Sequence, residues 1–148
     1  MNYFSTDKKE PLICLIGVGY VGLPLALEMS KAFKVIGYDK DSKRIDSLRA
    51  GKDPNGDCEF YDNFTENLDF TDDEKKIGLA DVYIVTVPTP IDEFNAPDLT
   101  PLKNATELVG RLLKKGNHVI FESTVYPTTT QSICIPILEK ASDLEVSK

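Results

Sequence analysis

The fold of this chain is decided by one stretch near its start: Leu12-Ile13-Cys14-Leu15-Ile16-Gly17-Val18-Gly19-Tyr20-Val21-Gly22. A short apolar run ends at Gly17, and the glycines then follow the spacing G-x-G-x-x-G. An apolar pattern at helical spacing comes directly afterwards, from Leu23 to Met29. A strand, a tight glycine turn and a helix start in this order are typical of the site that holds a dinucleotide pyrophosphate.

Each glycine of this turn has its own mechanical role. Gly17 permits the sharp turn, Gly19 lets the backbone approach a phosphate without a Cβ in the way, and Gly22 lets the helix lie close to the strand. Free backbone N–H groups and the positive end of the helix dipole then face the anion. Glycine-rich turns also occur for purely structural reasons, so the interpretation depends on the flanking strand and helix. The whole turn is a candidate cofactor-binding segment: Gly17, Val18, Gly19, Tyr20, Val21 and Gly22.

A carboxylate at the end of the second predicted strand supplies an independent test. The run Lys34-Val35-Ile36-Gly37-Tyr38-Asp39 favours a strand, and Asp39 follows Gly17 by 22 positions. A ribose-binding acid is expected about 20 positions after such a turn. This carboxylate would accept hydrogen bonds from the adenosine ribose and repel a 2′-phosphate, which favours NAD over NADP. The alternative is that Asp39 only caps a helix that begins near Asp41.

Strands and helices are expected to alternate along the chain. The expected strands are Leu12–Ile16, Lys34–Tyr38, Leu68–Thr71, Asp81–Val87 and His118–Phe121. Helices are expected at about residues 20–32, 42–50, 72–79 and 129–140, and another ends near residue 115. This pattern predicts an α/β fold, a doubly wound parallel sheet of the Rossmann type in three α/β/α layers. Right-handed crossovers favour the strand order 3-2-1-4-5, in a single domain over residues 1–148 with a tail at residues 1–10.

Two further strand ends place polar residues at the same edge of the predicted sheet. The fourth strand ends in Val87-Pro88-Thr89-Pro90, where the prolines stop regular structure. A rigid wall with one hydroxyl suits a flat cofactor ring, and a plain structural stop is the alternative. The fifth strand ends in Glu122-Ser123-Thr124, whose hydroxyls either cap the following helix or face a reacting group.

Composition argues against several classes of function. The formal net charge of −7 argues against a nucleic-acid partner. No apolar run approaches the ~18–20 residues that span a membrane, and the first eleven residues do not resemble a secretory signal.

The three cysteines are odd in number and widely spaced, without zinc-ligand spacing, which favours a reduced, cytoplasmic protein and no metal site. Residues 53–98 carry a net charge of −11, which fits either a solvated face or an interaction surface.

Taken together, the motifs resemble those of a known family, the nucleotide-sugar 6-dehydrogenases that oxidise UDP-glucose, UDP-N-acetylhexosamines or GDP-mannose. The resemblance runs from about Leu12 to Leu144. It rests on the glycine turn, Tyr38-Asp39 with Arg44, Val87-Pro88-Thr89-Pro90 and Glu122-Ser123-Thr124-Val125-Tyr126-Pro127. The branch acting on UDP-N-acetylhexosamines is most similar at Tyr126-Pro127 and at Ile135-Pro136-Ile137-Leu138-Glu139.

The resemblance implies an NAD-dependent, four-electron oxidation of the C6 alcohol of a UDP-sugar to a carboxylate, for polysaccharide precursor synthesis. Two NAD molecules are used in turn, and a cysteine thiol holds the aldehyde-level intermediate. By the same resemblance, the glycine turn holds the pyrophosphate, and Asp39 and Arg44 hold the adenosine ribose side. The remaining implied cofactor contacts are Val87, Pro88, Thr89, Ser123 and Thr124, and Thr124 also orients the catalytic water.

The chain departs from the family pattern at two places and lacks part of it. Thr128 stands where this branch often has glycine, and Gln131 stands in place of a glutamate. The family's cysteine nucleophile and its catalytic lysine and asparagine belong to positions beyond residue 148, and Cys14, Cys58 and Cys134 do not match the nucleophile's motif. We therefore expect the amino-terminal NAD-binding domain of a longer, homodimeric enzyme, which by itself binds NAD(H) without oxidising a nucleotide sugar.

Two other interpretations stay open at this point. A β-hydroxyacid dehydrogenase has the same glycine turn but a different signature after its fifth strand. A stand-alone NAD(H)-sensing module has a suitable length, but it needs a partner-binding or DNA-binding segment and has no use for a water-orienting Thr124.

Overall fold

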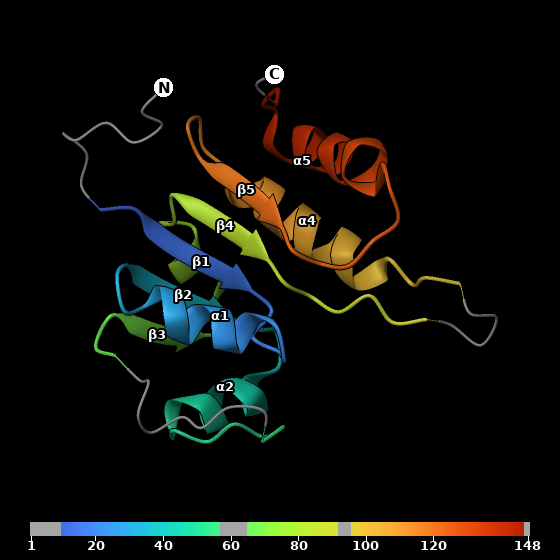
Figure 1. The fold of residues 1–148 in the computed structure, drawn as a ribbon. Helices are drawn as coiled ribbons and strands as arrows, with labels where there is room; N and C mark the ends of the chain where they lie inside the picture. The colour runs from blue at the N-terminus through green and yellow to red at the C-terminus, as the bar shows by residue number, and fades with distance from the viewer. Residues whose placement is uncertain (1–9, 57–64, 92–95, 147–148) are drawn as a thin grey trace.

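A five-stranded parallel sheet forms the centre of the molecule (Figure 1). The computed structural model describes residues 10–56, 65–91 and 96–146. The strands are β1 (Leu12–Ile16), β2 (Lys34–Tyr38), β3 (Leu68–Thr71), β4 (Val82–Val85) and β5 (His118–Phe121), in the order β3-β2-β1-β4-β5. The predicted doubly wound α/β fold and its strand order are confirmed.

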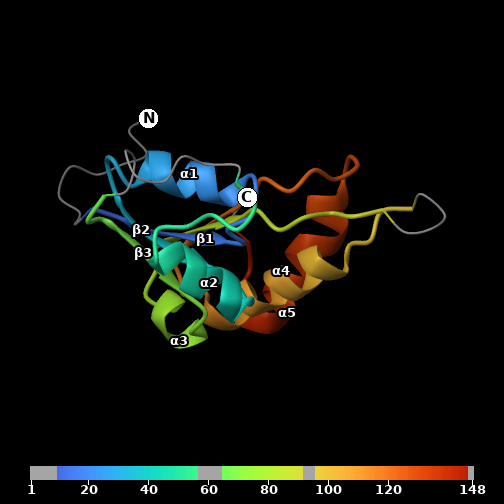
Figure 2. The same ribbon diagram turned by 90° about the horizontal axis from the view of Figure 1, so that it is seen from below.

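The helices cover both faces of this sheet. They are α1 (Gly22–Met29), α2 (Ser42–Arg49), α3 (Glu74–Ile77), α4 (Thr100–Leu112) and α5 (Ile135–Ser142). Apolar side chains of α1 and α2, such as Leu23 and Ile45, pack with Leu15 in one buried cluster. Those of α4 and α5, such as Leu102 and Leu138, belong to a second cluster. Figure 2 shows α1 on the opposite side of the sheet from α4 and α5, as the three-layer prediction requires.

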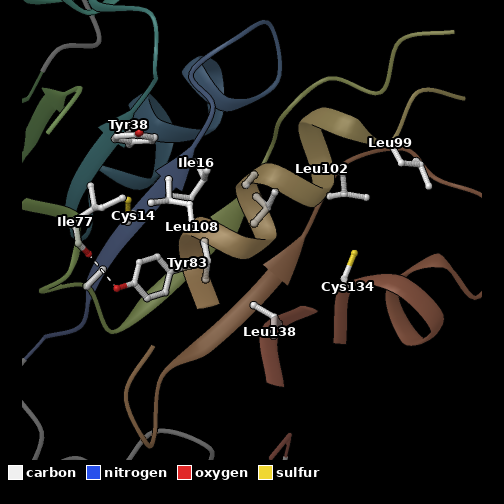
Figure 3. Packing of buried hydrophobic residues seen from close by; sticks show 14 residues of the cluster. Cys14, Ile16, Tyr38, Ile77, Tyr83, Leu99, Leu102, Leu108, Cys134 and Leu138 are labelled. Carbon is white, nitrogen blue, oxygen red and sulfur yellow. Dashed lines mark hydrogen bonds between the residues drawn. The ribbon is translucent and has the colours of Figure 1, made fainter. Parts of the chain in front are cut away.

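The second cluster holds two of the cysteines (Figure 3). Cys14 in β1 is completely buried, and this burial raises the pKa of its thiol far above the ordinary range. Burial also raises the pKa of Cys134. The Tyr83 hydroxyl lies in the same cluster and donates a hydrogen bond to the carbonyl of Ile77 at 3.0 Å, while burial raises the pKa of Tyr83 to about 12. Cys14 and Cys134 are therefore protonated core residues rather than nucleophiles; Cys58 lies outside the described residues.

The strand register aligns the carboxyl ends of the strands at one edge. Ile16 at the end of β1 pairs with Tyr38 on one side and with Val85 on the other. Val85 in turn pairs with Phe121 at the end of β5. The glycine turn, Asp39 and the segments after Val85 and Phe121 therefore leave the sheet at the same edge, where ligands bind in folds of this kind.

Several element boundaries differ from the predicted ones. The fourth strand ends at Val85 rather than Val87, and the first helix is shorter than residues 20–32 at both ends. The last helix does not begin as an α-helix, because Thr130–Cys134 form a π-helical turn before α5. Across the described ranges, none of the helices has the length and apolar character that crossing a bilayer requires.

Candidate functional site

The glycine turn is fixed to the sheet at its first residue. Gly17 adopts a φ of +95°, a left-handed conformation that glycine tolerates well. Its N–H donates to the carbonyl of Tyr38 at 2.8 Å, and its carbonyl accepts from the Thr86 hydroxyl at 2.6 Å. The same hydroxyl lies 3.2 Å from the carbonyl of Ile16. The turn is therefore anchored by β2 on one side and by Thr86, the residue after β4, on the other.

The other two glycines have opposite surroundings. A Cβ added to Gly19 would meet no atom within 4 Å, so open space lies beside the backbone at this point. A Cβ added to Gly22 would lie 1.9 Å from the carbonyl oxygen of Gly17 and 2.6 Å from the Thr86 hydroxyl oxygen. Gly22 thus allows α1 to approach the end of β1, and Gly19 leaves the backbone accessible to a ligand.

Backbone donors gather beside this open space. In the described part of the chain, the N–H groups of Gly19, Tyr20 and Val21 donate no hydrogen bond. No side chain caps the N-terminus of α1, which begins at Gly22. Unbonded N–H groups at the positive end of a helix dipole are the donor set that a phosphate prefers. The residues present therefore fit the pyrophosphate of a dinucleotide.

Asp39 lies directly against this turn. Its Oδ2 accepts from the N–H of Val18 at 3.2 Å, and its Oδ1 accepts from the N–H of Asp41 at 3.0 Å. The cap of α2 is a different residue, since Asp41 accepts from the N–H groups of Lys43 and Arg44. The alternative that Asp39 only caps this helix is therefore wrong, and its carboxylate joins the end of β2 to the glycine turn.

Arg44 holds the same residue of the turn from the other side. Its Nε donates to the carbonyl of Val18 at 2.7 Å, and its Nη2 lies 3.3 Å from Oδ1 of Asp53. The Arg44 side chain is 12% exposed and that of Asp53 only 1%. Val18 therefore donates its N–H to the Asp39 carboxylate and accepts at its carbonyl from the Arg44 guanidinium, and both side chains are implied cofactor contacts.

The ends of β4 and β5 are joined by two hydroxyl groups. Ser123 donates to the carbonyl of Val87 at 2.7 Å, and Thr89 donates to the carbonyl of Thr124 at 2.7 Å. The Thr89 and Ser123 protons are thus directed at the protein backbone. Pro88 and Thr124 are exposed at this edge. The segments that follow β4 and β5 are therefore joined to each other. They lie at the same edge of the sheet as the glycine turn, and this edge is called the rim below.

Two residues of this site were missed by the sequence reasoning. Thr86 anchors Gly17, and its only sequence signal is a hydroxyl side chain that interrupts the apolar run from Val82 to Val87. Asp53 pairs with Arg44 but falls in a stretch rich in glycine, proline and acids, where no single carboxylate stands out. Within the described ranges, no group of three or more His, Cys, Asp or Glu is arranged to hold a metal ion.

Thr128 adopts a backbone conformation that threonine disfavours. Its φ is +74°, in the left-handed region where a β-branched residue is an outlier. This is the position where the resembled branch often has glycine. The turn therefore has the geometry that glycine prefers, and the π-helical segment Thr130–Cys134 begins just after it.

Replacing Thr128 with glycine is expected to raise the free energy of unfolding by about 1 kcal/mol. The relief of left-handed strain exceeds the added entropy of the unfolded chain. Both hydrogen bonds that Ser132 donates here end on the Thr128 carbonyl, so the variant keeps them. Urea unfolding measures the change. In Thr130→Gly, the matched control without positive φ, stability should fall, and a fall in both variants would contradict the strain.

Comparison with known proteins identifies the family. Residues 11–148 match the sequence profile of the NAD binding domain of the UDP-glucose/GDP-mannose dehydrogenase family. The chain belongs to this family. The predicted membership and the predicted NAD-binding domain are thereby confirmed, and the match decides against a β-hydroxyacid dehydrogenase.

Relatives of this dehydrogenase domain are similar over nearly all of it. The UDP-N-acetyl-D-glucosamine 6-dehydrogenase of Pseudomonas aeruginosa is 45% identical over 141 residues, which cover 95% of this chain and 33% of that protein. The enzyme of the same name from Salmonella typhi is 46% identical over 136 residues, covering 91% and 32%. A ternary complex of GDP-mannose dehydrogenase from Pseudomonas aeruginosa has a TM-score of 0.83 at 29% identity, covering 90% and 33%. The chain thus spans about a third of the length of these relatives.

Proposed function

We propose that this domain serves a nucleotide-sugar 6-dehydrogenase that oxidises the C6 alcohol of a UDP-N-acetylhexosamine to the carboxylate. The observation that carries the proposal is the set of unbonded N–H groups of Gly19, Tyr20 and Val21 beside Asp39. The 45% identity to a UDP-N-acetyl-D-glucosamine 6-dehydrogenase favours this sugar class over UDP-glucose. The product is a uronic acid for polysaccharide precursor synthesis.

Different residues at the carboxyl edge of the sheet bind different parts of the cofactor. The turn from Gly17 to Gly22 binds the pyrophosphate, and Asp39 and Arg44 bind the adenosine ribose side. Bound NAD supplies the hydride acceptor for the oxidation. Five contacts are proposed for the rest of the cofactor: Val87, Pro88, Thr89, Ser123 and Thr124.

Thr124 has a second proposed role. Its side chain is exposed at the end of β5, and its carbonyl is held by the Thr89 hydroxyl at 2.7 Å. A threonine whose backbone is fixed in this way presents its own hydroxyl in a defined direction. We assign it the positioning of the catalytic water near the nicotinamide.

The assembly and the compartment belong to the proposal as well. We propose a homodimer for the whole enzyme and a reducing, cytoplasmic setting. The buried thiols of Cys14 and Cys134 support the second point, because neither is placed to serve as an exposed, oxidisable cysteine.

Two measurements test the proposed function in sequence. Calorimetric titration of this chain with NAD should give saturable binding with one site. The intact enzyme should then form NADH, followed by its absorbance, with UDP-N-acetylhexosamines in a panel that also contains UDP-glucose and GDP-mannose. Two NADH per sugar are expected. Absence of NAD binding, or a 3-hydroxyacid as the preferred substrate, would contradict the proposal.

Replacing Asp39 with asparagine is expected to weaken NAD binding by about 1–2 kcal/mol. A charge-assisted hydrogen bond to the ribose becomes a neutral one. Fluorescence or calorimetric titration measures the dissociation constant. Asp41→Asn is the matched control, because it removes the same charge two residues away and asparagine caps a helix as well as aspartate does. Equal effects of the two substitutions would rule out a ribose contact by Asp39.

A further inference from the structure

Asp53 is the partner of an arginine at the cofactor site, although it lies well outside the motifs. It follows α2 in the chain, and its Oδ1 lies 3.3 Å from Nη2 of Arg44. The same oxygen accepts from the N–H of Asn55 at 3.1 Å, so the carboxylate is held by its own turn. With its side chain 1% exposed, Asp53 is an acid that is buried against the guanidinium.

The Arg44 guanidinium therefore donates hydrogen bonds to two separate partners. Its Nε is bonded to the carbonyl of Val18 and its Nη2 to Asp53. Asp39 accepts from the N–H of the same Val18, so the acid and the guanidinium flank one residue of the glycine turn. Together Asp39, Arg44 and Asp53 carry two negative charges and one positive charge.

This balance of charge bears on the choice between the two nicotinamide dinucleotides. NADP differs from NAD by a phosphate on the adenosine 2′-hydroxyl, and a phosphomonoester carries about −1.5 to −2 charges near pH 7. In related folds an arginine near the ribose-binding acid accommodates this phosphate. Here Arg44 lies near the proposed ribose-binding acid, Asp39, but the buried carboxylate of Asp53 already neutralises the charge of its guanidinium.

We propose that Asp53 is a specificity-determining residue that withholds the charge of Arg44 from a 2′-phosphate and keeps its guanidinium on the glycine turn. This inference rests on the proposed NAD-binding function. Asp39 excludes the phosphate by direct repulsion, whereas Asp53 acts through Arg44. The two acids therefore make separate contributions to NAD preference.

The test is the ratio of the dissociation constants for NADP and NAD, measured by calorimetry on the unchanged protein and on Asp53→Asn. Asparagine keeps an acceptor for the Asn55 N–H and removes the negative charge. The ratio is expected to fall about tenfold, because Arg44 becomes available to the phosphate. Asp46→Asn is the matched control, since it removes an equal charge from the exposed face of α2 beside Arg49, and its ratio should not change.

A second substitution separates action through Arg44 from a general loss of negative charge. Arg44→Gln should weaken NAD and NADP binding by similar factors, because the guanidinium is not available to the phosphate in the unchanged protein. In this background, Asp53→Asn should leave the ratio unaltered. If Arg44→Gln alone weakens NADP binding more than fivefold relative to NAD, Arg44 already serves the phosphate and the inference is wrong, even where Asp53→Asn fails to fold.

Different results would contradict the role of Asp53 and the proposed NAD-binding function. NAD binding with an unchanged ratio in folded Asp53→Asn makes the ion pair purely structural and contradicts this inference alone. An unchanged protein that binds neither dinucleotide contradicts the proposed function, and the inference with it. Thermal melting of each variant, without nucleotide, shows which proteins are folded.

Discussion

Replacing Gly19 with valine is expected to abolish NAD binding and to leave the protein folded. An added Cβ at this position meets no atom within 4 Å, and the backbone has no positive φ there, so we expect the fold to accept valine without left-handed strain. Its side chain instead fills the space beside the N–H groups of Tyr20 and Val21. The loss should be at least about 100-fold, or roughly 2.7 kcal/mol, because several bonds to a charged group are prevented together.

Two readouts make this prediction specific. Calorimetry should detect no NAD binding in Gly19→Val, while the thermal midpoint without NAD stays within about 2 °C of the unchanged protein, as expected for a substitution without buried contacts. Gly78→Ala is the control for a glycine replaced elsewhere, since its added Cβ makes an ordinary contact at 3.4 Å with Leu112. Retained binding in Gly19→Val would mean that the turn is only structural.

The sheet is predictable from the sequence because its central strands, β1 and β4, are buried on both faces. Continuous apolar runs such as Leu12–Ile16 identify strands directly, and short loops with right-handed crossovers leave few ways to order them. The approach of Asp39 to the glycine turn follows from the same logic, because parallel neighbours end at one edge. Spacing along the chain therefore predicts that Asp39 lies at the edge of the glycine turn, whereas its hydrogen bond with the N–H of Val18 is seen only in the structure.

The hydrogen bonds that fix the rim are not predictable in this way. The Thr86 N–H donates to the carbonyl of Ile16 at 2.9 Å, and its hydroxyl reaches the carbonyl of Gly17, a contact that depends on the exact position of this backbone. The pair between Arg44 and Asp53 depends on how the chain returns after α2, and many conformations of a loop with glycine and proline fit the same sequence. Side-chain pairs of this kind depend on backbone positions that hydrophobic patterns do not specify.

The start of the last helix shows a conflict between local preference and tertiary structure. Threonine disfavours a positive φ, yet Thr128 adopts +74° and a π-helical turn follows at Thr130–Cys134. The buried Cys134 at the end of this turn packs in the cluster that holds α4 and α5 together. Packing of the helix against α4 thus overrides the preference of a single residue, and residue preferences alone predict an ordinary helix over this segment.

The close approach of α1 to β1 makes Gly22 a sensitive position for stability. In Gly22→Ala the new Cβ would lie 1.9 Å from the carbonyl oxygen of Gly17 and 2.6 Å from the Thr86 hydroxyl oxygen. The carbonyl is main chain and is fixed by the Thr86 hydroxyl, so the helix itself must move away from the sheet. We expect the free energy of unfolding to fall by about 2–3 kcal/mol, even though alanine favours a helix over glycine by about 1 kcal/mol.

Urea unfolding measures this loss, and Gly19→Ala is its matched control in the same turn. The control adds the same methyl group to open space and should change stability by less than about 0.5 kcal/mol. Adding Thr86→Ala to Gly22→Ala removes the 2.6 Å contact but leaves the shorter overlap with the Gly17 carbonyl, so the double variant should stay destabilised. Full stability of Gly22→Ala would show that α1 shifts freely on the sheet, and a turn held so loosely could not keep its N–H groups directed at a phosphate.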